Sequence, residues 1–235
     1  MIYTTIHQKY TEGKKQFAVL IDPEKSSDEH LSSLIDEVNK SSVDFILLGG
    51  STGDSAADEV LSTLRSRTDK KIVLFPGNVT HLTKGVDAVL FLSLISGRNT
   101  DYLIENHVKA VPLLDGVEVI PVGYMLLDGG RKSSTELVSH TRPMAIDDIS
   151  LIVNTAKAGE LLGHKMIYLE AGSGAVNSLP SAVITAVKSV LTIPLIVGGG
   201  LRSASDVKRV YEAGADVAVV GNALEENPHL LSTLC

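Results

Sequence analysis

The sequence predicts an α/β fold, a single (β/α)8 TIM barrel that forms one domain over residues 1–235. Eight short runs rich in Val, Ile and Leu alternate with amphipathic stretches, which is the order that produces a parallel sheet covered by helices. The runs are almost continuously apolar, as in strands that are buried on both faces. A doubly wound open sheet is the alternative, but eight strand-helix units in 235 residues fit a compact barrel better.

The predicted strands are short apolar runs bounded by glycine, proline or polar residues. Their β-branched and leucine-rich composition favours strands over short buried helices. In chain order they cover residues 17–22, 43–49, 71–75, 88–95, 118–127, 165–170, 194–198 and 216–221.

Between most strands, apolar residues recur at helical spacing. Ser27 and Ser203 precede two of these patterns and are typical N-cap residues, Pro180 fits a first helical turn, and Gly214 fits the position after a last turn. Too few residues follow Pro76 for a long helix, so the third helix is expected to be reduced. The predicted helices cover 27–38, 55–64, 146–162, 178–187 and 203–214.

Composition excludes several classes of protein. The formal net charge of −7 and pI near 5.5 argue against general nucleic-acid binding and against adhesion to anionic lipid by charge alone. The lone cysteine, Cys235, fits a reducing compartment and has no residues after it for a prenylation signal. With no signal-peptide pattern and no apolar run of about 18 residues, we expect a soluble, cytoplasmic protein without an integral membrane segment. The seven histidines have no closely spaced ligand pair, which disfavours zinc.

The strongest local signal is a pair of glycine elements near the end of the chain. Gly199 and Gly200 follow the seventh strand, and Gly221 and Asn222 follow the eighth. These two loops form the common phosphate site of TIM barrels, where backbone amides approach the anion closely. A triple glycine alone would be only a tight turn, but the two elements together predict a phosphate site.

The sixth strand ends in a second polar segment. Tyr168 and Glu170 share one face of the strand, and Ser173 lies in the glycine-rich loop that follows. Glu170 could hydrogen-bond a substrate hydroxyl and assist removal of its proton. An ion pair with an arginine or lysine of the rim is an equally good interpretation of Glu170 from residue type alone.

A third signal is a carboxylate and a hydroxyl on neighbouring strand ends. Asp22 follows the first strand and Ser51 follows the second. Mg²⁺ takes a few oxygen ligands from protein and the rest from water and substrate phosphates, so the pair fits a sparse magnesium site. Asp22 could instead cap the segment after it.

Together, the segments at the strand ends resemble the geranylgeranylglyceryl phosphate synthase family, which includes bacterial heptaprenylglyceryl phosphate synthases. The resemblance extends from the first strand to the last and depends on the order of the motifs. They are Leu-Ile-Asp-Pro-Glu-Lys at 20–25, Leu-Gly-Gly-Ser-Thr-Gly at 48–53, Phe-Pro-Gly-Asn at 75–78, Ser-Leu-Ile-Ser-Gly-Arg-Asn at 93–99, Tyr-Leu-Glu-Ala-Gly-Ser-Gly at 168–174, Val-Gly-Gly-Gly at 197–200 and Val-Gly-Asn at 220–222.

This resemblance implies an enzyme that joins sn-glycerol 1-phosphate to a polyprenyl diphosphate and releases diphosphate. It implies Mg²⁺ at Asp22 and Ser51, and catalytic roles for Glu170 and Tyr168 at the attacking hydroxyl. It also implies a homo-oligomer, either dimer or hexamer, with at most peripheral membrane contact. The implied substrate-binding residues are Tyr168, Leu169, Glu170, Ala171, Gly172, Ser173, Gly174, Gly199, Gly200, Gly221 and Asn222.

The chain departs from the family at one position. Some bacterial members carry lysine two residues before the aspartate, where this sequence has Leu20. Phosphate charge would then be left to Mg²⁺ and backbone amides, with Lys25 or Arg98 as the candidate side chains. The motif after the fourth strand resembles a subgroup that favours a twenty-carbon donor, with thirty-five carbons as the rival. The alternatives are an isomerase or lyase acting on a sugar phosphate, and a non-catalytic phosphometabolite-binding barrel.

Overall fold

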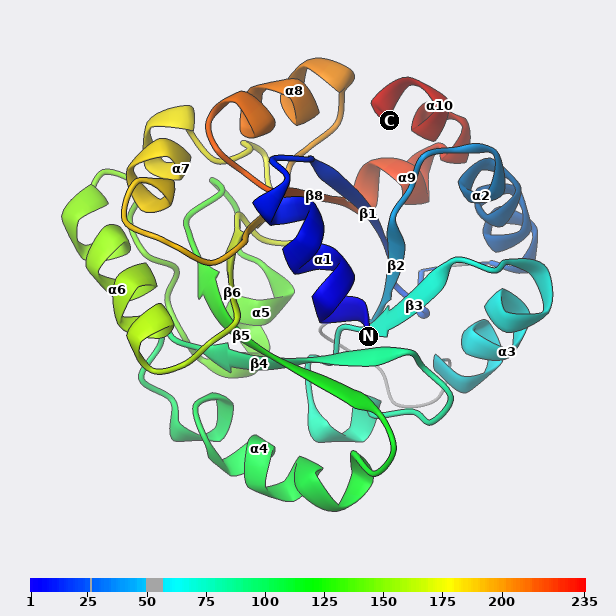
Figure 1. Cartoon of the computed structure of the whole chain (residues 1–235), viewed down its shortest axis with the longest axis horizontal. Coiled ribbons are helices and arrows are strands. Elements are labelled where there is room, and N and C mark those ends of the chain that lie inside the picture. The colour runs from blue at the N-terminus through cyan, green and yellow to red at the C-terminus, as the bar shows by residue number, and fades with distance from the viewer. Residues whose placement is uncertain (26, 50–56) are drawn as a thin grey trace.

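The computed structural model describes residues 1–25, 27–49 and 57–235 and contains a closed barrel of eight parallel strands in the order β1 to β8 (Figure 1). Every predicted strand is present, with ends shifted by no more than a few residues, so the (β/α)8 prediction is confirmed. The strands are β1 (Gln16–Ile21), β2 (Phe45–Leu48), β3 (Lys71–Leu74), β4 (Ala88–Leu94), β5 (Glu118–Leu126), β6 (Met166–Glu170), β7 (Leu195–Gly198) and β8 (Val217–Val220).

Strand alternation divides the apolar residues into two clusters. One cluster fills the barrel interior and contains Tyr168, Val73 and Val219. The other lies between the strands and the helices and contains Leu169 and Val197. Since successive side chains of a strand point to opposite faces, the two clusters account for the continuous apolar runs.

The helices surround the barrel (Figure 1). Ser27 and Ser203 accept hydrogen bonds as N-caps, and Gly214 has a φ of +117° just after its helix, all as predicted. Pro180 stands at an N-cap, one residue before the expected turn. The helices are α1 (Ile2–Thr11), α2 (Asp28–Lys40), α3 (Ala57–Arg67), α4 (Glu105–Ala110), α5 (Ser134–Ser139), α6 (Ile149–Leu161), α7 (Ser181–Lys188), α8 (Ala204–Glu212), α9 (Asn222–Glu226) and α10 (Leu231–Leu234).

The third strand-helix unit is reduced, as the sequence indicates. Between β3 and β4 the structure has only one turn of 3₁₀-helix, η1 (Val79–His81), capped by the Asn78 side chain. The side of the barrel next to this turn therefore lacks the long helix that covers most other strands. Further 3₁₀ turns are η2 (Thr100–Tyr102), η3 (Val111–Leu113) and η4 (Pro228–Leu230).

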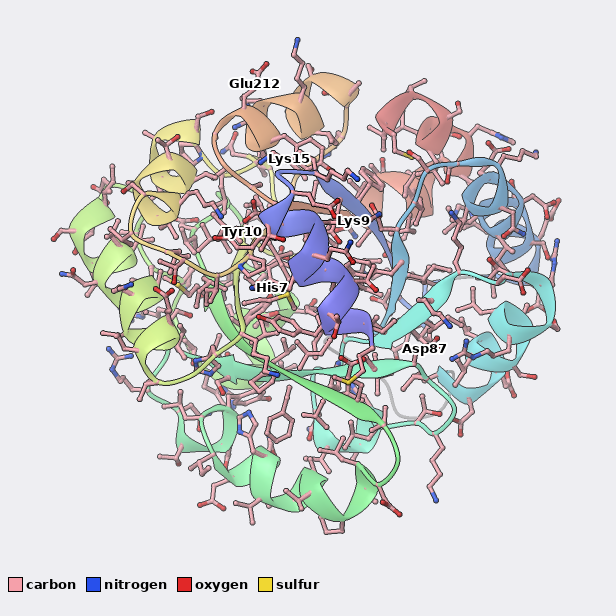
Figure 2. All side chains as sticks on the ribbon, viewed as in Figure 1. His7, Lys9, Tyr10, Lys15, Asp87 and Glu212 are labelled. Atoms are coloured by element: carbon pink, nitrogen blue, oxygen red, sulfur yellow. The ribbon has the colours of Figure 1, made fainter. Side chains whose placement is uncertain are left out.

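Helix α1 was not expected from the sequence. It lies across the end of the barrel where the strands begin (Figure 1), and its His7, Lys9 and Tyr10 side chains are shown there in Figure 2. Lys9 pairs with Asp44 just before β2, and the Tyr10 hydroxyl donates to the carbonyl of Thr192 (3.0 Å) just before β7. Since α1 covers this end of the barrel, the opposite end is the one available for a site. Among the described residues, no helix is both long and apolar enough to cross a membrane.

Candidate active site

A pocket lined by many polar and charged groups, which we call the polar pocket, lies at the carboxyl end of the strands. Groups from both ends of the sequence meet in it, because barrel closure brings β1 beside β8. The predicted site residues that line it are Asp22, Tyr168, Glu170, Ser173, Gly174, Gly199, Gly200, Gly221 and Asn222.

Three predicted substrate-binding residues do not line this pocket. The side chains of Leu169 and Ala171 belong to the cluster between strands and helices, and the Ala171 N–H donates to the carbonyl of Gly198 (3.1 Å). Gly172 contacts the site indirectly, because its N–H donates to Glu170 Oε1 (2.7 Å). These residues support the site, whereas Ser51, the second predicted metal ligand, lies outside the described residues.

Glu170 is a buried carboxyl at the end of β6, only 7% exposed. Burial raises the pKa of Glu170 from 4.5 to about 7, against the opposing effect of the hydrogen bond from the Gly172 N–H. A group with this pKa gains and loses protons near neutral pH, which suits a general base. No lysine or arginine of the described residues affects the pKa of Glu170, so the structure gives no support to the alternative in which it serves only as a rim ion pair.

The Tyr168 hydroxyl and the Glu170 carboxyl lie close against Gly198. A Cβ placed on Gly198 would lie 2.5 Å from the Tyr168 hydroxyl oxygen and 2.9 Å from Glu170 Oε2, so only glycine leaves room for these two groups. The buried Tyr168 hydroxyl lies beside the Glu170 carboxyl, and the hydrogen bond between them opposes the rise in the pKa of Glu170. Because both groups line the polar pocket, a ligand hydroxyl there could hydrogen-bond either of them.

The glycine loops form a cradle of backbone amides. Gly199 and Gly200 have φ values of +83° and +70°, which glycine adopts without strain. Within residues 1–25, 27–49 and 57–235, their N–H groups have no hydrogen-bond acceptor. Asn222 Oδ1 accepts from the Gly174 N–H (2.8 Å) and the Ser173 hydroxyl (3.4 Å), which ties the β6 loop to the start of α9. The cradle has the chemistry of an anion site.

Asp22 and Lys25 form a charged group at the edge of the same pocket. Lys25 Nζ lies 2.9 Å from Asp22 Oδ2 and 3.7 Å from Glu225 Oε2, and it donates to the Ser173 hydroxyl (3.4 Å). Sequence reasoning missed Glu225, which stands three residues after Asn222 and accepts from its amide (2.8 Å). Arg98 was predicted as an alternative phosphate contact, but its guanidinium donates to the carbonyls of Ile95 and Gly97 in its own loop.

A second pocket lies beside the polar one, where only the short turn η1 stands between β3 and β4. Its walls are largely apolar and come from β4, η1, η2 and α4. Phe75 and Tyr124 line both pockets, so they stand at the boundary between them. The lining includes Phe75, Val79, Leu82, Leu90, Phe91, Leu92, Leu94, Tyr102, His107, Ala110, Tyr124 and Val138. Phe75 begins one of the motifs of the family resemblance, but neither it nor Tyr124 was predicted as a site residue, although both come from strand ends, where site residues of a barrel are expected.

Comparison with known proteins gives consistent results. The model of the PcrB family matches residues 9–234. A geranylgeranylglyceryl phosphate synthase of Zunongwangia profunda is 50% identical over 91% of this chain and 92% of its own length. A second protein of that name, from Spirosoma linguale, is 43% identical over 98% of this chain and 94% of its own length.

A solved structure matches at the level of the whole fold. The crystal structure of (S)-3-O-geranylgeranylglyceryl phosphate synthase from Thermoplasma acidophilum, in complex with its substrate sn-glycerol-1-phosphate, superposes with a TM-score of 0.92. It is 31% identical, and the alignment covers 100% of this chain and 95% of the Thermoplasma chain.

Proposed function

The chain belongs to the PcrB family, and from that premise we propose that it is a prenyltransferase that makes an ether lipid precursor. Its substrates are sn-glycerol 1-phosphate and a polyprenyl diphosphate, with geranylgeranyl as the proposed prenyl group. The products are a prenylglyceryl phosphate and diphosphate. The Thermoplasma relative binds sn-glycerol-1-phosphate, which supports the choice of acceptor.

The observation that carries this proposal is the adjacency of the two pockets. The polar pocket offers amides for a phosphate and a buried carboxyl for a hydroxyl, whereas the neighbouring pocket offers apolar walls. A prenyl transfer needs both environments at one reacting carbon. An isomerase or lyase for a sugar phosphate would use the polar pocket alone and gives no reason for the apolar one.

In the proposed reaction, the N–H groups of Gly199 and Gly200 hold the phosphate of the acceptor. Its free primary hydroxyl lies in the polar pocket beside Tyr168 and Glu170, which both line it. Tyr168 orients the hydroxyl, and the carboxylate of Glu170 accepts its proton as the oxygen attacks the allylic carbon. The bond between that carbon and the diphosphate breaks, and the electron pair leaves with the diphosphate.

The donor set fits the proposed Mg²⁺. Asp22 is a buried carboxylate that lines the pocket, and Glu225 adds a second one across Lys25. One or two carboxylates with the remaining ligands from phosphate and water is the usual style of magnesium sites. Asp22 would hold the ion, and the ion would neutralise charge on the leaving diphosphate. Lys25, now paired with Asp22, is then free to contact phosphate oxygens.

The test supplies the purified protein with Mg²⁺, sn-glycerol 1-phosphate and radiolabelled prenyl diphosphates of twenty and thirty-five carbons. The expected result is a solvent-extractable phosphate ester, formed fastest from the twenty-carbon donor. The sn-glycerol 3-phosphate enantiomer serves as the matched control acceptor and should react far more slowly. No product from either donor would refute the proposed function.

We also propose that the enzyme is a cytoplasmic homo-oligomer with at most peripheral contact with lipid. Apolar side chains are exposed along α4 and α6, including Val108, Leu161 and Leu162. Large exposed apolar patches commonly mark contacts between subunits. Light scattering after size-exclusion chromatography measures the mass, and a monomer at micromolar concentration would contradict an oligomer. Cell fractionation tests the location.

A further inference from the structure

Three aromatic rings meet at the carboxyl end of the barrel. Phe75 follows β3, Tyr124 lies on β5 and Tyr168 lies on β6. The centroid of the Tyr168 ring lies 5.6 Å from that of Phe75 and 5.3 Å from that of Tyr124, and the remaining pair is 6.0 Å apart. All three belong to the apolar cluster of the barrel interior, and they account for three of the ten Phe and Tyr residues in the chain.

This aromatic cluster stands at the junction of the two pockets. Phe75 and Tyr124 line both pockets, and Tyr168 lines the polar one beside Glu170. A prenyl diphosphate has its charged group on one side of the reacting carbon and its apolar tail on the other. With each part in the environment that suits it, the reacting carbon lies against these rings.

The backbone fixes the position of Phe75. Its N–H donates to the carbonyl of Leu48 (2.8 Å), and Gly49 lies directly against it. A Cβ on Gly49 would lie 2.1 Å from the Phe75 carbonyl oxygen, and Gly49 has a φ of +145°. Only glycine permits this approach, so the end of β2 holds Phe75 close to the barrel axis.

We propose that Phe75 and Tyr124 are catalytic residues whose π-faces stabilise the positive charge that develops on the allylic carbon; this inference rests on the proposed function. As the carbon–oxygen bond to the diphosphate breaks, its electron pair leaves with the diphosphate and the allyl group becomes electron-poor. An oxygen lone pair of the acceptor hydroxyl then forms the new bond, and its proton goes to Glu170. The electron-rich faces of aromatic rings attract cations most strongly where water is excluded.

Burial makes this attraction effective. Phe75 is 9% exposed, Tyr124 6% and Tyr168 0%, so the rings lie in a largely water-free region. The same burial raises the pKa of the Tyr124 and Tyr168 hydroxyls well above the ordinary value, which keeps both rings neutral at working pH. A neutral ring cannot form a permanent ion pair, so its stabilisation is specific to charge that appears during the reaction.

The test replaces Phe75 with phenylalanine carrying one, two or three fluorine atoms. Fluorine withdraws electron density from the face of the ring and changes its size little. The expected result is a stepwise fall in the single-turnover rate, reaching roughly thirtyfold for the trifluoro ring, with the KM for sn-glycerol 1-phosphate unchanged. The matched control is the same series at Phe45, which is buried in the barrel interior and lines neither pocket.

Binding of a stable cation gives a readout that does not depend on turnover. The probe is a prenyl tertiary amine, protonated at neutral pH, added with inorganic diphosphate, and its carbon isostere is the neutral comparison. Across the fluorinated Phe75 series, the Kd of the amine should rise in parallel with the loss of rate while the Kd of the isostere stays constant. Equal rates and equal amine affinities across the series, in a protein whose unmodified form makes product, would overturn the inference. Absence of product from the unmodified protein would instead refute the proposed function.

Discussion

Glu170→Gln should make the protein more stable at alkaline pH while it removes most of the activity. Burial raises the pKa of Glu170 from 4.5 to about 7, so the folded protein favours the protonated carboxyl. That difference in pKa corresponds to about 3 kcal/mol. The favourable contribution of the protonated group is complete below pH 4.5 and is lost as the pH rises through 7. Above pH 7, the ionised carboxylate destabilises the folded state by the whole amount.

Glutamine removes this cost without a change of shape. Its carbonyl oxygen keeps the hydrogen bond from the Gly172 N–H, which is 2.7 Å long in the structure. Its amide can donate to the neighbouring Tyr168 hydroxyl, which interacts with the Glu170 carboxyl in the parent. The variant should therefore match the parent in stability near pH 4.5 and exceed it by about 3 kcal/mol at pH 8.5.

Urea unfolding between pH 4.5 and 9, without substrate or metal, measures the effect. Asp87→Asn is the control of opposite sign: although burial raises the pKa of Asp87, hydrogen bonds from the Ile72 N–H, Arg65 and Lys71 lower it overall. That variant should lose stability at neutral pH.

The single-turnover rate of Glu170→Gln should fall by about a hundredfold or more, with no inflection left near pH 7 in the plot of rate against pH. A variant no more stable than the parent at pH 8.5 would refute the assigned burial cost, and a parental rate would refute the proton transfer.

Three further substitutions test the cradle and the metal site. Gly200 has a φ of +70°, and the Cβ added by Gly200→Ala would lie 2.8 Å from the Ser178 N. Urea unfolding should therefore show that the free energy of unfolding falls by about 2 kcal/mol. Unchanged stability would contradict the need for glycine at this position. Asn222→Ala removes the acceptor for the Gly174 N–H and should raise the KM for sn-glycerol 1-phosphate about tenfold with little change in kcat, whereas an unchanged KM would place the phosphate elsewhere. Asp22→Asn should raise the Mg²⁺ concentration for half-maximal rate about tenfold or more, and a parental titration curve would remove Asp22 from the metal site.

Much of the fold could be predicted because burial on both faces leaves a plain pattern in the sequence. All eight strands are largely apolar runs. The short segment after Pro76 correctly predicted that no long helix lies between β3 and β4. Helix α1 gave no such signal. It is held by contacts to residues distant in the sequence: Ile6 is buried in the cluster of the barrel interior, and the Glu118 carboxylate accepts from the Tyr3 N–H (3.0 Å). These contacts exist only in the closed barrel.

The site shows the same division. Tyr168, Glu170 and the glycine loops could be assigned because strand alternation and the end of each strand fix where they point. The same alternation places Leu169 in the cluster between the strands and the helices. Leu169 was predicted to bind substrate only because the whole motif at 168–174 was assigned to the site. Phe75 and Tyr124 could not be assigned, because their importance depends on the boundary between two pockets formed by five or more separate segments.

The most direct test of the central claim follows the attacking oxygen. The free primary hydroxyl of sn-glycerol 1-phosphate is labelled with ¹⁸O, and the prenyl product and diphosphate are analysed by mass spectrometry after one turnover. We predict that the ether oxygen of the product carries the label and that the diphosphate carries none. Label lost from the product, or found in the diphosphate, would contradict attack by the hydroxyl held between Tyr168 and Glu170.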